Sequence, residues 1–171
     1  MATSSDDTKS LSSLIPSGPW TIYFHSPEET KWTLNTFVSL GSMKTWHQFW
    51  SIMEVLNPDS FSEGMFFLMR DPAPPLWESH YHIRGGCYSF RCQKKEAADV
   101  YLTYVIASML ETVSSVDNRV NGISISPKRG FNIIKVWNSD SQKFSHPSTL
   151  HPISHIRESE IIYTPFVQKK M

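Results

Sequence analysis

The sequence predicts an α+β fold: a mostly antiparallel sheet of six to eight short strands with two long helices packed on it. Short β-prone runs alternate with turn residues, and two longer segments carry apolar side chains at helical spacing. The chain has 171 residues, of which 40% are hydrophobic, and this is enough for the core of one compact domain.

The first residues differ in composition from the rest. Residues 1–17 are mostly polar, and their apolar content is mainly Leu11, Leu14 and Ile15, too little to offset the entropy of ordering the segment. We therefore predict a flexible tail over residues 1–17 and one folded domain over residues 18–171.

A hairpin follows the predicted tail. The run Pro19–His25 is β-prone, Ser26–Thr30 is turn-like and charged, and a second strand is expected at about Thr33–Leu40. This arrangement places Trp32 at the mouth of the hairpin.

The first predicted helix begins with Ser42 as its cap and continues to about Leu56. Phe49 lies on one face of this helix, whereas Trp46 and Trp50, four residues apart, lie on another. A helix with two apolar faces leaves one of them exposed.

The middle of the chain combines a buried strand with a stiff loop. Gly64–Met69 is the most hydrophobic short run and suits a central strand. The segment Asp71–Pro75 contains three prolines, so it fits neither a strand interior nor a helix, and it presents Trp77 and Glu78.

The remaining elements complete the sheet and the second helix. In that helix Tyr101, Val105 and Met109 face inward, and Leu102 and Ile106 form a neighbouring stripe. The segments are a strand at Cys87–Cys92, a helix at Glu96–Val113, strands at Gly122–Ser126 and Phe131–Trp137 joined by the turn Pro127–Gly130, a loop at Ser139–His155 and a last strand at Ile161–Tyr163.

Composition and motifs exclude several classes of function. Sixteen basic and sixteen acidic residues cancel, so a broad positive field for nucleic acid is missing and any contact is local. Two cysteines, no bilayer-length apolar run and a polar first segment indicate a reduced protein that is neither secreted nor inserted in a membrane. The common phosphate-loop, nucleophile-elbow and zinc-protease motifs are absent, so we expect no enzyme and no cofactor.

Several landmarks recur in a familiar order and spacing: Lys31-Trp32, Phe49-Trp50, Leu76-Trp77-Glu78, Arg84-Gly85-Gly86 and Val136-Trp137. With them the chain, from about Trp20 to Tyr163, resembles the eukaryotic translation initiation factor 4E family, which binds the 7-methylguanosine cap of messenger RNA. The resemblance implies a curved antiparallel sheet with helices on its convex face and the cap slot on its concave face. It also implies a cytoplasmic protein, monomeric apart from its partners.

The resemblance assigns roles that the chemistry of the cap explains. Trp32 and Trp77 would stack on the methylated base, whose positive charge gains about 1–2 kcal/mol between indole faces. Glu78 would accept two parallel hydrogen bonds from guanine. Lys128 and Arg129 would bind the phosphates, although they also suit an ordinary hairpin turn. Cys87 stands where the family commonly has arginine, so we expect weaker cap binding than in typical members.

A second site is implied on the helical face, for a 4G-type scaffold protein or a 4E-binding repressor that docks a helix. The matching residues are Trp46, Trp50, Leu102 and Ile106. The alternative is that the N-terminal tail covers this apolar stripe.

Three other functions are open at this stage. One alternative is a repressor that sequesters caps, and another is an interaction module that keeps the fold without binding a cap. Histidine pairs, His80 with His82 and His151 with His155, suggest a metal hydrolase as an alternative, but no further ligand completes a recognisable set and we expect no metal.

Overall fold

A computed structural model describes residues 13–143, 146–153 and 156–167. Seven strands form one sheet, in which every pairing is antiparallel and the strand order is β2-β1-β3-β5-β6-β4-β7. The strands are β1 (Trp20–His25), β2 (Val38–Met43), β3 (Met65–Arg70), β4 (Gly86–Cys92), β5 (Val120–Pro127), β6 (Asn132–Asn138) and β7 (Ile162–Pro165).

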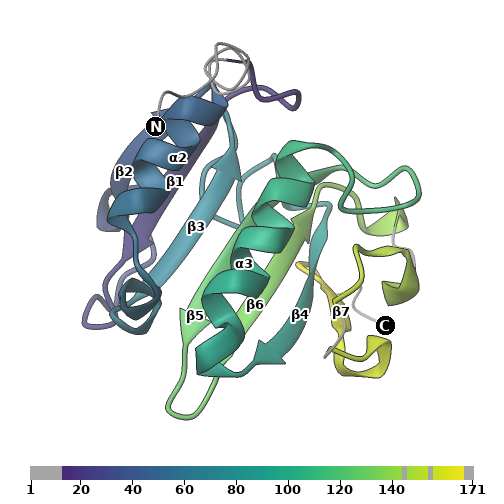
Figure 1. Cartoon of the computed structure of the whole chain (residues 1–171). Coiled ribbons are helices and arrows are strands. Elements are labelled where there is room, and N and C mark those ends of the chain that lie inside the picture. Colours follow the sequence, from purple (N-terminus) through teal and green to yellow (C-terminus); the bar gives the residue numbers. More distant parts are fainter. Residues whose placement is uncertain (1–12, 144–145, 154–155, 168–171) are drawn as a thin grey trace, which may run out of the picture.

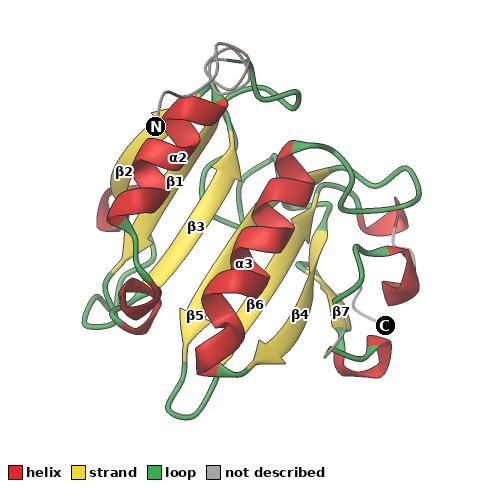
Figure 2. Cartoon of the chain, viewed as in Figure 1, coloured by secondary structure: helices red, strands yellow, loops and turns green. Residues whose placement is uncertain are grey.

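Two helices, α2 (Trp46–Val55) and α3 (Lys94–Met109), lie side by side on one face of the sheet (Figure 1). Figure 2 shows that loops and short helical turns make up the connections and most of the C-terminal part. The predicted α+β fold, a curved antiparallel sheet with two helices on its convex face, is confirmed.

The main core lies between the sheet and the helices. Trp20, Phe49, Tyr101 and Ile123 are fully buried there, because alternate strand positions and one stripe of each helix face each other. A second, smaller cluster occupies the opposite, concave face of the sheet. Its buried members are Phe37, Phe67, Met69, Cys87 and Trp137.

The hairpin differs from the sequence-based prediction. Residues Leu34–Thr36 form a 3-10 turn, and β2 begins only at Val38. The Thr36 hydroxyl donates to the carbonyl of Thr33 at 2.7 Å and accepts from its N–H at 3.3 Å. Such local bonds from threonine side chains compete with the strand ladder, so the predicted strand at Thr33–Leu40 was misplaced by several residues.

The cap of α2 also differs from the prediction. Thr45, rather than Ser42, caps the helix: its hydroxyl accepts from the Gln48 N–H at 3.2 Å, and the Gln48 side chain accepts from the Thr45 N–H at 3.3 Å. Ser42 instead lies in β2 and bonds the Thr21 hydroxyl at 2.8 Å. The helix therefore starts directly at Trp46.

The second helix is shorter than expected because a turn with Glu111 at φ 58° follows Met109. The predicted loop at 139–155 contains 3-10 turns at Ser141–Lys143 and Pro147–Thr149 in its described part. The last strand starts at Ile162 and reaches Pro165.

The folded part of the chain begins before the expected boundary at residue 18. Ile15 is 2% exposed, and its N–H donates to the carbonyl of Lys44 at 2.8 Å. The Ser17 hydroxyl donates to the carbonyl of Met109 and accepts from the Trp20 indole N–H, at 2.8 and 2.7 Å. Within the expected tail, Ile15 and Ser17 are therefore packed against the domain, and residues 1–12 lie outside the described residues.

Candidate functional site

Trp32 lies in the loop between β1 and β2, at the end of the sheet where β1 finishes. Its indole is 49% exposed, which is unusual for the largest side chain and leaves much of the ring available to a ligand. The indole stacks on His25, with ring centroids 3.9 Å apart and an interplanar angle of 4°, and its edge meets Phe37. The second of these contacts ties the exposed ring to the concave cluster.

Trp77 and Glu78 lie in a turn of the loop between β3 and β4, where the Ser79 N–H donates to the carbonyl of Leu76 at 3.2 Å. Trp77 is 42% exposed and stacks on Phe166, with centroids 6.2 Å apart and an interplanar angle of 25°. Glu78 is exposed, and no hydrogen bond or ion pair joins its carboxylate to another described residue. Its oxygens are therefore available to accept from a ligand.

Buried His82 holds this loop in place. It is fully buried, it lies against Trp137 with centroids 5.1 Å apart, and its Nε2 donates to the carbonyl of Pro74 at 2.9 Å. Burial lowers the pKa of His82, since a charged imidazolium would lose its hydration there. The ring is thus neutral at pH 7, and it fixes the segment that carries Trp77.

A chain of ring contacts joins the two exposed indoles across the concave face. Successive ring centroids lie 5.9, 5.2, 6.0, 5.1 and 6.2 Å apart. The rings are, in order, Trp32, Phe37, Phe67, Trp137, Phe166 and Trp77. Residues from both ends of the chain therefore build one aromatic floor, and each end of it presents an exposed indole.

Lys128 and Arg129 are exposed in the β5–β6 turn, which the Lys128 N–H closes by donating to the carbonyl of Phe131 at 2.8 Å. Near the end of β5, which finishes at Pro127, Ile125 pairs with Phe66 at the start of β3. The preceding β3 residue, Met65, pairs with His25 at the end of β1. The turn therefore lies at the end of the sheet that carries Trp32. In the described part of the chain neither cation has an ion pair.

Lys135 is a basic residue that the sequence-based search missed. It lies on β6 between Ser89 of β4 and Ser124 of β5, on the face opposite Ile134 and Val136, which belong to the main core. Burial raises the pKa of the Cys87 thiol, and the positive charge of Lys135 acts in the opposite direction, so the two side chains are neighbours. Residues two apart on a strand share a face, so the position of Trp137 could have placed Lys135 on the concave face from the sequence alone.

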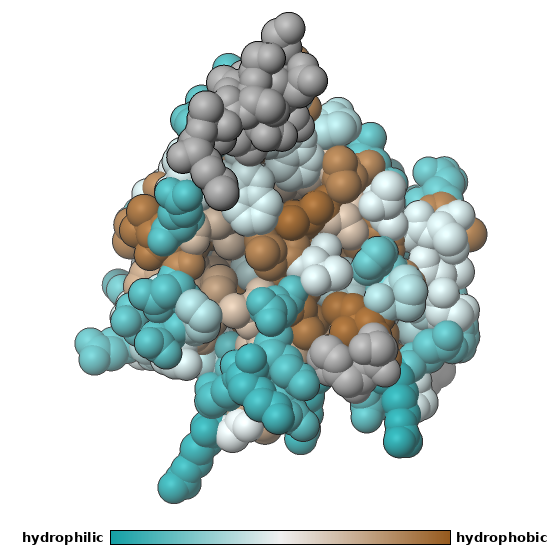
Figure 3. Space-filling view, in the orientation of Figure 1, coloured by the Kyte–Doolittle hydropathy of each residue, from teal (hydrophilic) through white to brown (hydrophobic). Residues whose placement is uncertain are grey.

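The helical face carries the second predicted set. Trp46 and Trp50 flank buried Phe49, with ring centroids 5.7 and 5.0 Å from it, and Trp50 is 39% exposed. Leu102 and Ile106 are half-buried on α3. Figure 3, which views this face, shows hydrophobic side chains gathered between the two helices. Trp46, Leu102 and Ile106 pack against the main core and Trp50 contacts Phe49, so all four residues lie on the helical side of the sheet.

The described part of the N-terminal segment touches only the beginning of that surface. The backbone N–H of Trp46 donates to the carbonyl of Ser13 at 3.2 Å, and Leu14 forms a bridge with Thr45. Trp50 keeps its exposure with this segment in place.

The histidine pairs form no metal site in the part of the chain that the structure describes, where no group of three or more His, Cys, Asp or Glu side chains converges. His80 and His82 lie in a turn, not on a strand, and the His80 ring lies tilted against Tyr81, with centroids 4.0 Å apart. His155 lies outside the described residues.

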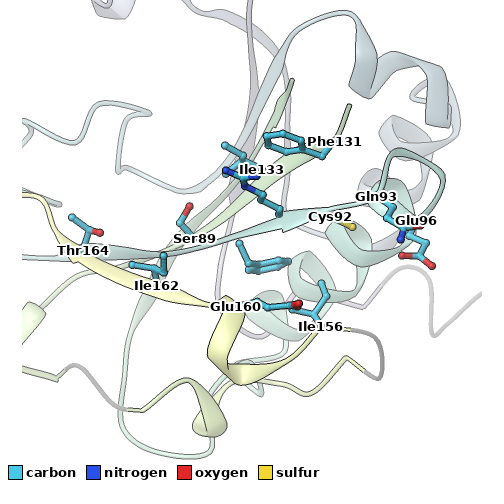
Figure 4. A pocket seen from close by; sticks show the side chains of 12 residues that line it. Ser89, Cys92, Gln93, Glu96, Phe131, Ile133, Ile156, Glu160, Ile162 and Thr164 are labelled. Carbon is cyan, nitrogen blue, oxygen red and sulfur yellow. The ribbon is translucent and has the colours of Figure 1, made fainter. Parts of the chain in front are cut away.

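A cavity of about 720 Å³ lies away from the tryptophans, beside the part of β4 that β7 leaves uncovered (Figure 4). Phe90, Ile133 and Ile156 line it together with the carboxylates Glu96 and Glu160. Burial, with a smaller effect of Glu96, raises the pKa of the Cys92 thiol in this wall to about 11, so the thiol is protonated at pH 7.

The structure thus combines an aromatic cluster with two exposed indoles on one face of the sheet and apolar side chains around two helices on the other. The family profile described as Eukaryotic initiation factor 4E matches residues 17–159, and the chain belongs to this family. Neither of the long helices in the described residues has the length and apolar character needed to span a bilayer.

Initiation factors 4E of several fungi are similar in sequence to the chain. The chain is 25% identical over 131 residues to eukaryotic translation initiation factor 4E of Saccharomyces cerevisiae. The matched region covers 72% of this chain and 61% of that protein. The chain is 30% identical over 133 residues to factor 4E-1 of Schizosaccharomyces pombe, covering 70% and 57%. The chain thus spans about three fifths of the length of these relatives.

Solved structures share the fold. A complex of Ascaris suum eIF4E-3 with an m2,2,7G cap superimposes with a TM-score of 0.66 at 16% identity, covering 77% of this chain and 76% of that one. A complex of C. elegans eIF4E-3 with the 4E-binding protein Mextli gives a TM-score of 0.67 at 13% identity, covering 77% of this chain and 78% of that one.

Proposed function

We propose that the chain binds the 7-methylguanosine cap of messenger RNA on the concave face of its sheet. Trp32 and Trp77 stack on the two faces of the base, and Glu78 accepts hydrogen bonds from its N1 and exocyclic amine. The observation that carries this proposal is the pair of exposed indoles at the two ends of one aromatic floor. Directly after the second stands the carboxylate of Glu78, which has no hydrogen bond or ion pair to another described residue.

The phosphates of the cap extend from the base toward positive charge. We assign Lys128 and Arg129, which lie at the Trp32 end of the sheet, and Lys135, which lies on the concave face. Lys135 replaces part of the charge lost where Cys87 stands in place of the arginine common in the family. One recessed lysine does not restore a forked guanidinium contact, so cap binding is weaker than in typical members.

The helical face recruits a partner through Trp46, Trp50, Leu102 and Ile106. An exposed tryptophan beside aliphatic side chains suits a docked amphipathic helix, as in a 4G-type scaffold or a 4E-binding repressor. The chain then acts in the cytoplasm as a monomer apart from its partners, without enzymatic activity. With a scaffold protein bound, the chain acts as an initiation factor. With a repressor bound, it uses the same cap site to sequester caps.

Tryptophan fluorescence tests the cap site directly. Titration with 7-methyl-GTP is expected to give saturable quenching that unmethylated GTP does not reproduce, and Trp77→Ala and Glu78→Gln each weaken it at least tenfold. Trp50→Ala is the matched control, because it removes an equally exposed indole from the opposite face and leaves the affinity unchanged. Equal and weak responses to both nucleotides in all four proteins would show that the fold serves protein contacts alone.

A further inference from the structure

Arg91 is a cation of the concave face that the proposed cap site does not use. It is exposed on β4 between Phe90 and Cys92, which face the main core, so its side chain points to the concave side. Its guanidinium lies over the ring of Phe131, with Cζ 4.5 Å from the ring centroid. In the described part of the chain Arg91 has no ion pair. Phe131 therefore supports a positive charge that remains available to a ligand.

Arg91 also lies in the wall of the cavity beside β4 (Figure 4). The cavity reaches the strand edge because β7 pairs with β4 only as far as Ser89. Ile162 and Thr164 of β7 pair with Ser89 and Cys87, so they share the concave face with them. The concave half of the cavity is lined by Ser89, Arg91, Phe131, Ile133, Ile162 and Thr164. It thus combines one cation, apolar side chains and two hydroxyl groups.

The acidic residues of the cavity belong to its other half. Glu96 is carried by α3, on the helical face of the sheet. Glu160 lies beside Ile156, across β4 from Phe131 and Ile133 (Figure 4). The strand therefore separates both carboxylates from the concave half, where Arg91 is the charged residue of the wall.

The strand order places the concave half next to the proposed phosphate site. From β3 the sheet continues as β5, β6, β4 and β7, away from the strands that flank Trp32. Lys135 of β6 pairs with Ser89, and Arg91 follows two residues along β4. Such diagonal neighbours are about 7–8 Å apart and within reach of long side chains. A ligand whose phosphates meet Lys135 therefore continues toward Arg91.

We propose that Arg91 and the concave half of the cavity bind the nucleoside that follows the triphosphate of a capped RNA. The inference rests on the proposed cap binding and extends that site by one nucleoside. The base stacks on the guanidinium, which Phe131 supports from its other side, and contacts Ile162. The hydroxyls of Ser89 and Thr164 suit hydrogen bonds with the ribose.

Size and chemistry favour a nucleoside over a peptide. The volume of the whole cavity, about 720 Å³, lies within the usual range for sites that hold small ligands. Ile162 is 65% exposed and offers an apolar contact to a base. An extended peptide could pair only with Phe90–Cys92, the short stretch of β4 that β7 leaves uncovered, and would gain few backbone hydrogen bonds there.

The test compares 7-methyl-GTP with 7-methyl-GpppA, in which adenosine follows the triphosphate. Arg91→Lys keeps the positive charge, and with it the attraction of the phosphates, but loses the flat group on which a base stacks. Isothermal titration calorimetry is expected to show 7-methyl-GpppA binding weakened about three- to tenfold and 7-methyl-GTP binding weakened less than about twofold. Arg119→Lys is the matched control, because Arg119 is exposed at the opposite end of the sheet, and it changes neither affinity.

A second measurement locates the nucleoside without mutation. Nuclear magnetic resonance of isoleucine methyl groups is expected to show Ile162 shifting with 7-methyl-GpppA and not with 7-methyl-GTP. Ile123, which is fully buried in the main core, is the control and keeps its position with both ligands. Thermal unfolding checks that Arg91→Lys folds. Ile162→Ala, at an exposed position, is a second variant that weakens only 7-methyl-GpppA.

The outcomes separate the inference from the proposed function. Equal losses of both ligands in Arg91→Lys, or no loss of either, would overturn the nucleoside site and leave cap binding standing. An Ile162 signal that moves with neither ligand, while both bind, would do the same and leave the β4 edge to a peptide. Binding of neither ligand in a methyl-dependent way by the wild type would overturn cap binding, and the inference with it.

Discussion

At the residue scale, the proposed phosphate side of the site has cysteine at position 87, where the family resemblance implies an arginine. Cys87 is a buried thiol whose pKa is raised by burial, so it supplies neither a cation nor a thiolate at pH 7. Lys135 stands close to it on the same face of the sheet, and Lys128 and Arg129 are carried by the adjoining turn. On this face β6 therefore carries a cation, Lys135, beside the neutral Cys87 of β4.

Replacing Lys135 tests this assignment. Lys135→Gln is expected to weaken binding of 7-methyl-GTP about three- to tenfold, because one cation–phosphate contact is lost, and to leave 7-methylguanosine binding unchanged. Isothermal titration calorimetry with both ligands measures the difference. Lys95→Gln, exposed on α3, is the matched control; an equal loss for nucleoside and nucleotide would place Lys135 away from the phosphates.

At the scale of single elements, α2 depends on its cap. The helix has ten residues, which is marginal for an isolated helix, and it carries Trp46 and Trp50 of the proposed partner surface. The reciprocal bonds between Thr45 and Gln48 satisfy its first N–H groups. This helix cap therefore fixes the start of α2 and, with it, the position of Trp46 in the proposed partner surface.

Removal of that cap has a predictable cost. Thr45→Ala is expected to lower the free energy of unfolding by about 1 kcal/mol. Urea denaturation measures the change, and Ser51→Ala, which removes an exposed hydroxyl in the middle of the same helix, should cost less than half as much. Equal effects of the two substitutions would contradict the capping role.

The helix α3 is attached to the C-terminal part of the chain by Tyr104. Its hydroxyl donates to the carbonyl of His151 at 2.9 Å, and burial raises its pKa to about 12, above the ordinary value of 10.0. A raised phenol pKa means that the neutral form is favoured in the folded state. The resulting stability is fully present below pH 10 and is lost as the pH rises toward 12.

Alkaline denaturation tests this attachment. Between pH 10 and 12 the free energy of unfolding should fall more steeply in the wild type than in Tyr104→Phe, by up to about 1.4 kcal/mol per pH unit. Tyr81→Phe, at a half-exposed position in a loop, is the control and should keep the wild-type slope. A Tyr104→Phe slope equal to that of the wild type would refute a buried phenol at this position.

At the scale of the whole molecule, the segment before β1 closes one end of the main core. The Ile15 N–H bonds to the carbonyl of Lys44, just before α2, and the Ser17 hydroxyl bonds to the carbonyl of Met109, at the end of α3. The segment thus links these ends of the two helices. Leu14, next to Ile15, is 72% exposed. Ile15 and Leu14 are therefore a matched pair for mutation, two adjacent aliphatic residues of which one is buried and the other exposed.

Truncation at these positions separates a packed segment from a tail. Ile15→Ala is expected to cost about 2–4 kcal/mol, the usual range for removing a buried aliphatic side chain, whereas Leu14→Ala stays within about 0.5 kcal/mol. Chemical denaturation of both variants gives the values. Similar small changes for the two would restore the domain boundary at residue 18.

Much of this protein could be predicted from its sequence because the signals are local. Short β-prone and hydrophobic runs between turn residues gave six of the seven strands near their observed positions, and fourfold spacing gave the buried face of α3. The hairpin strand and the α2 cap were displaced, since Thr33, Thr36 and Thr45 satisfy the backbone through side-chain bonds that a periodic pattern does not register.

The sequence by itself determined the order of elements, the family landmarks and the residue types that suit a cationic base. Only the tertiary structure decided that Phe166 supports Trp77, that His25 lies beneath Trp32 and that Lys135 shares their face. These contacts join positions between 7 and 89 residues apart, and the pairing of β4 with β6 and β7 brings the distant ones together. Sheet register is set by the whole core, so a local pattern does not contain it.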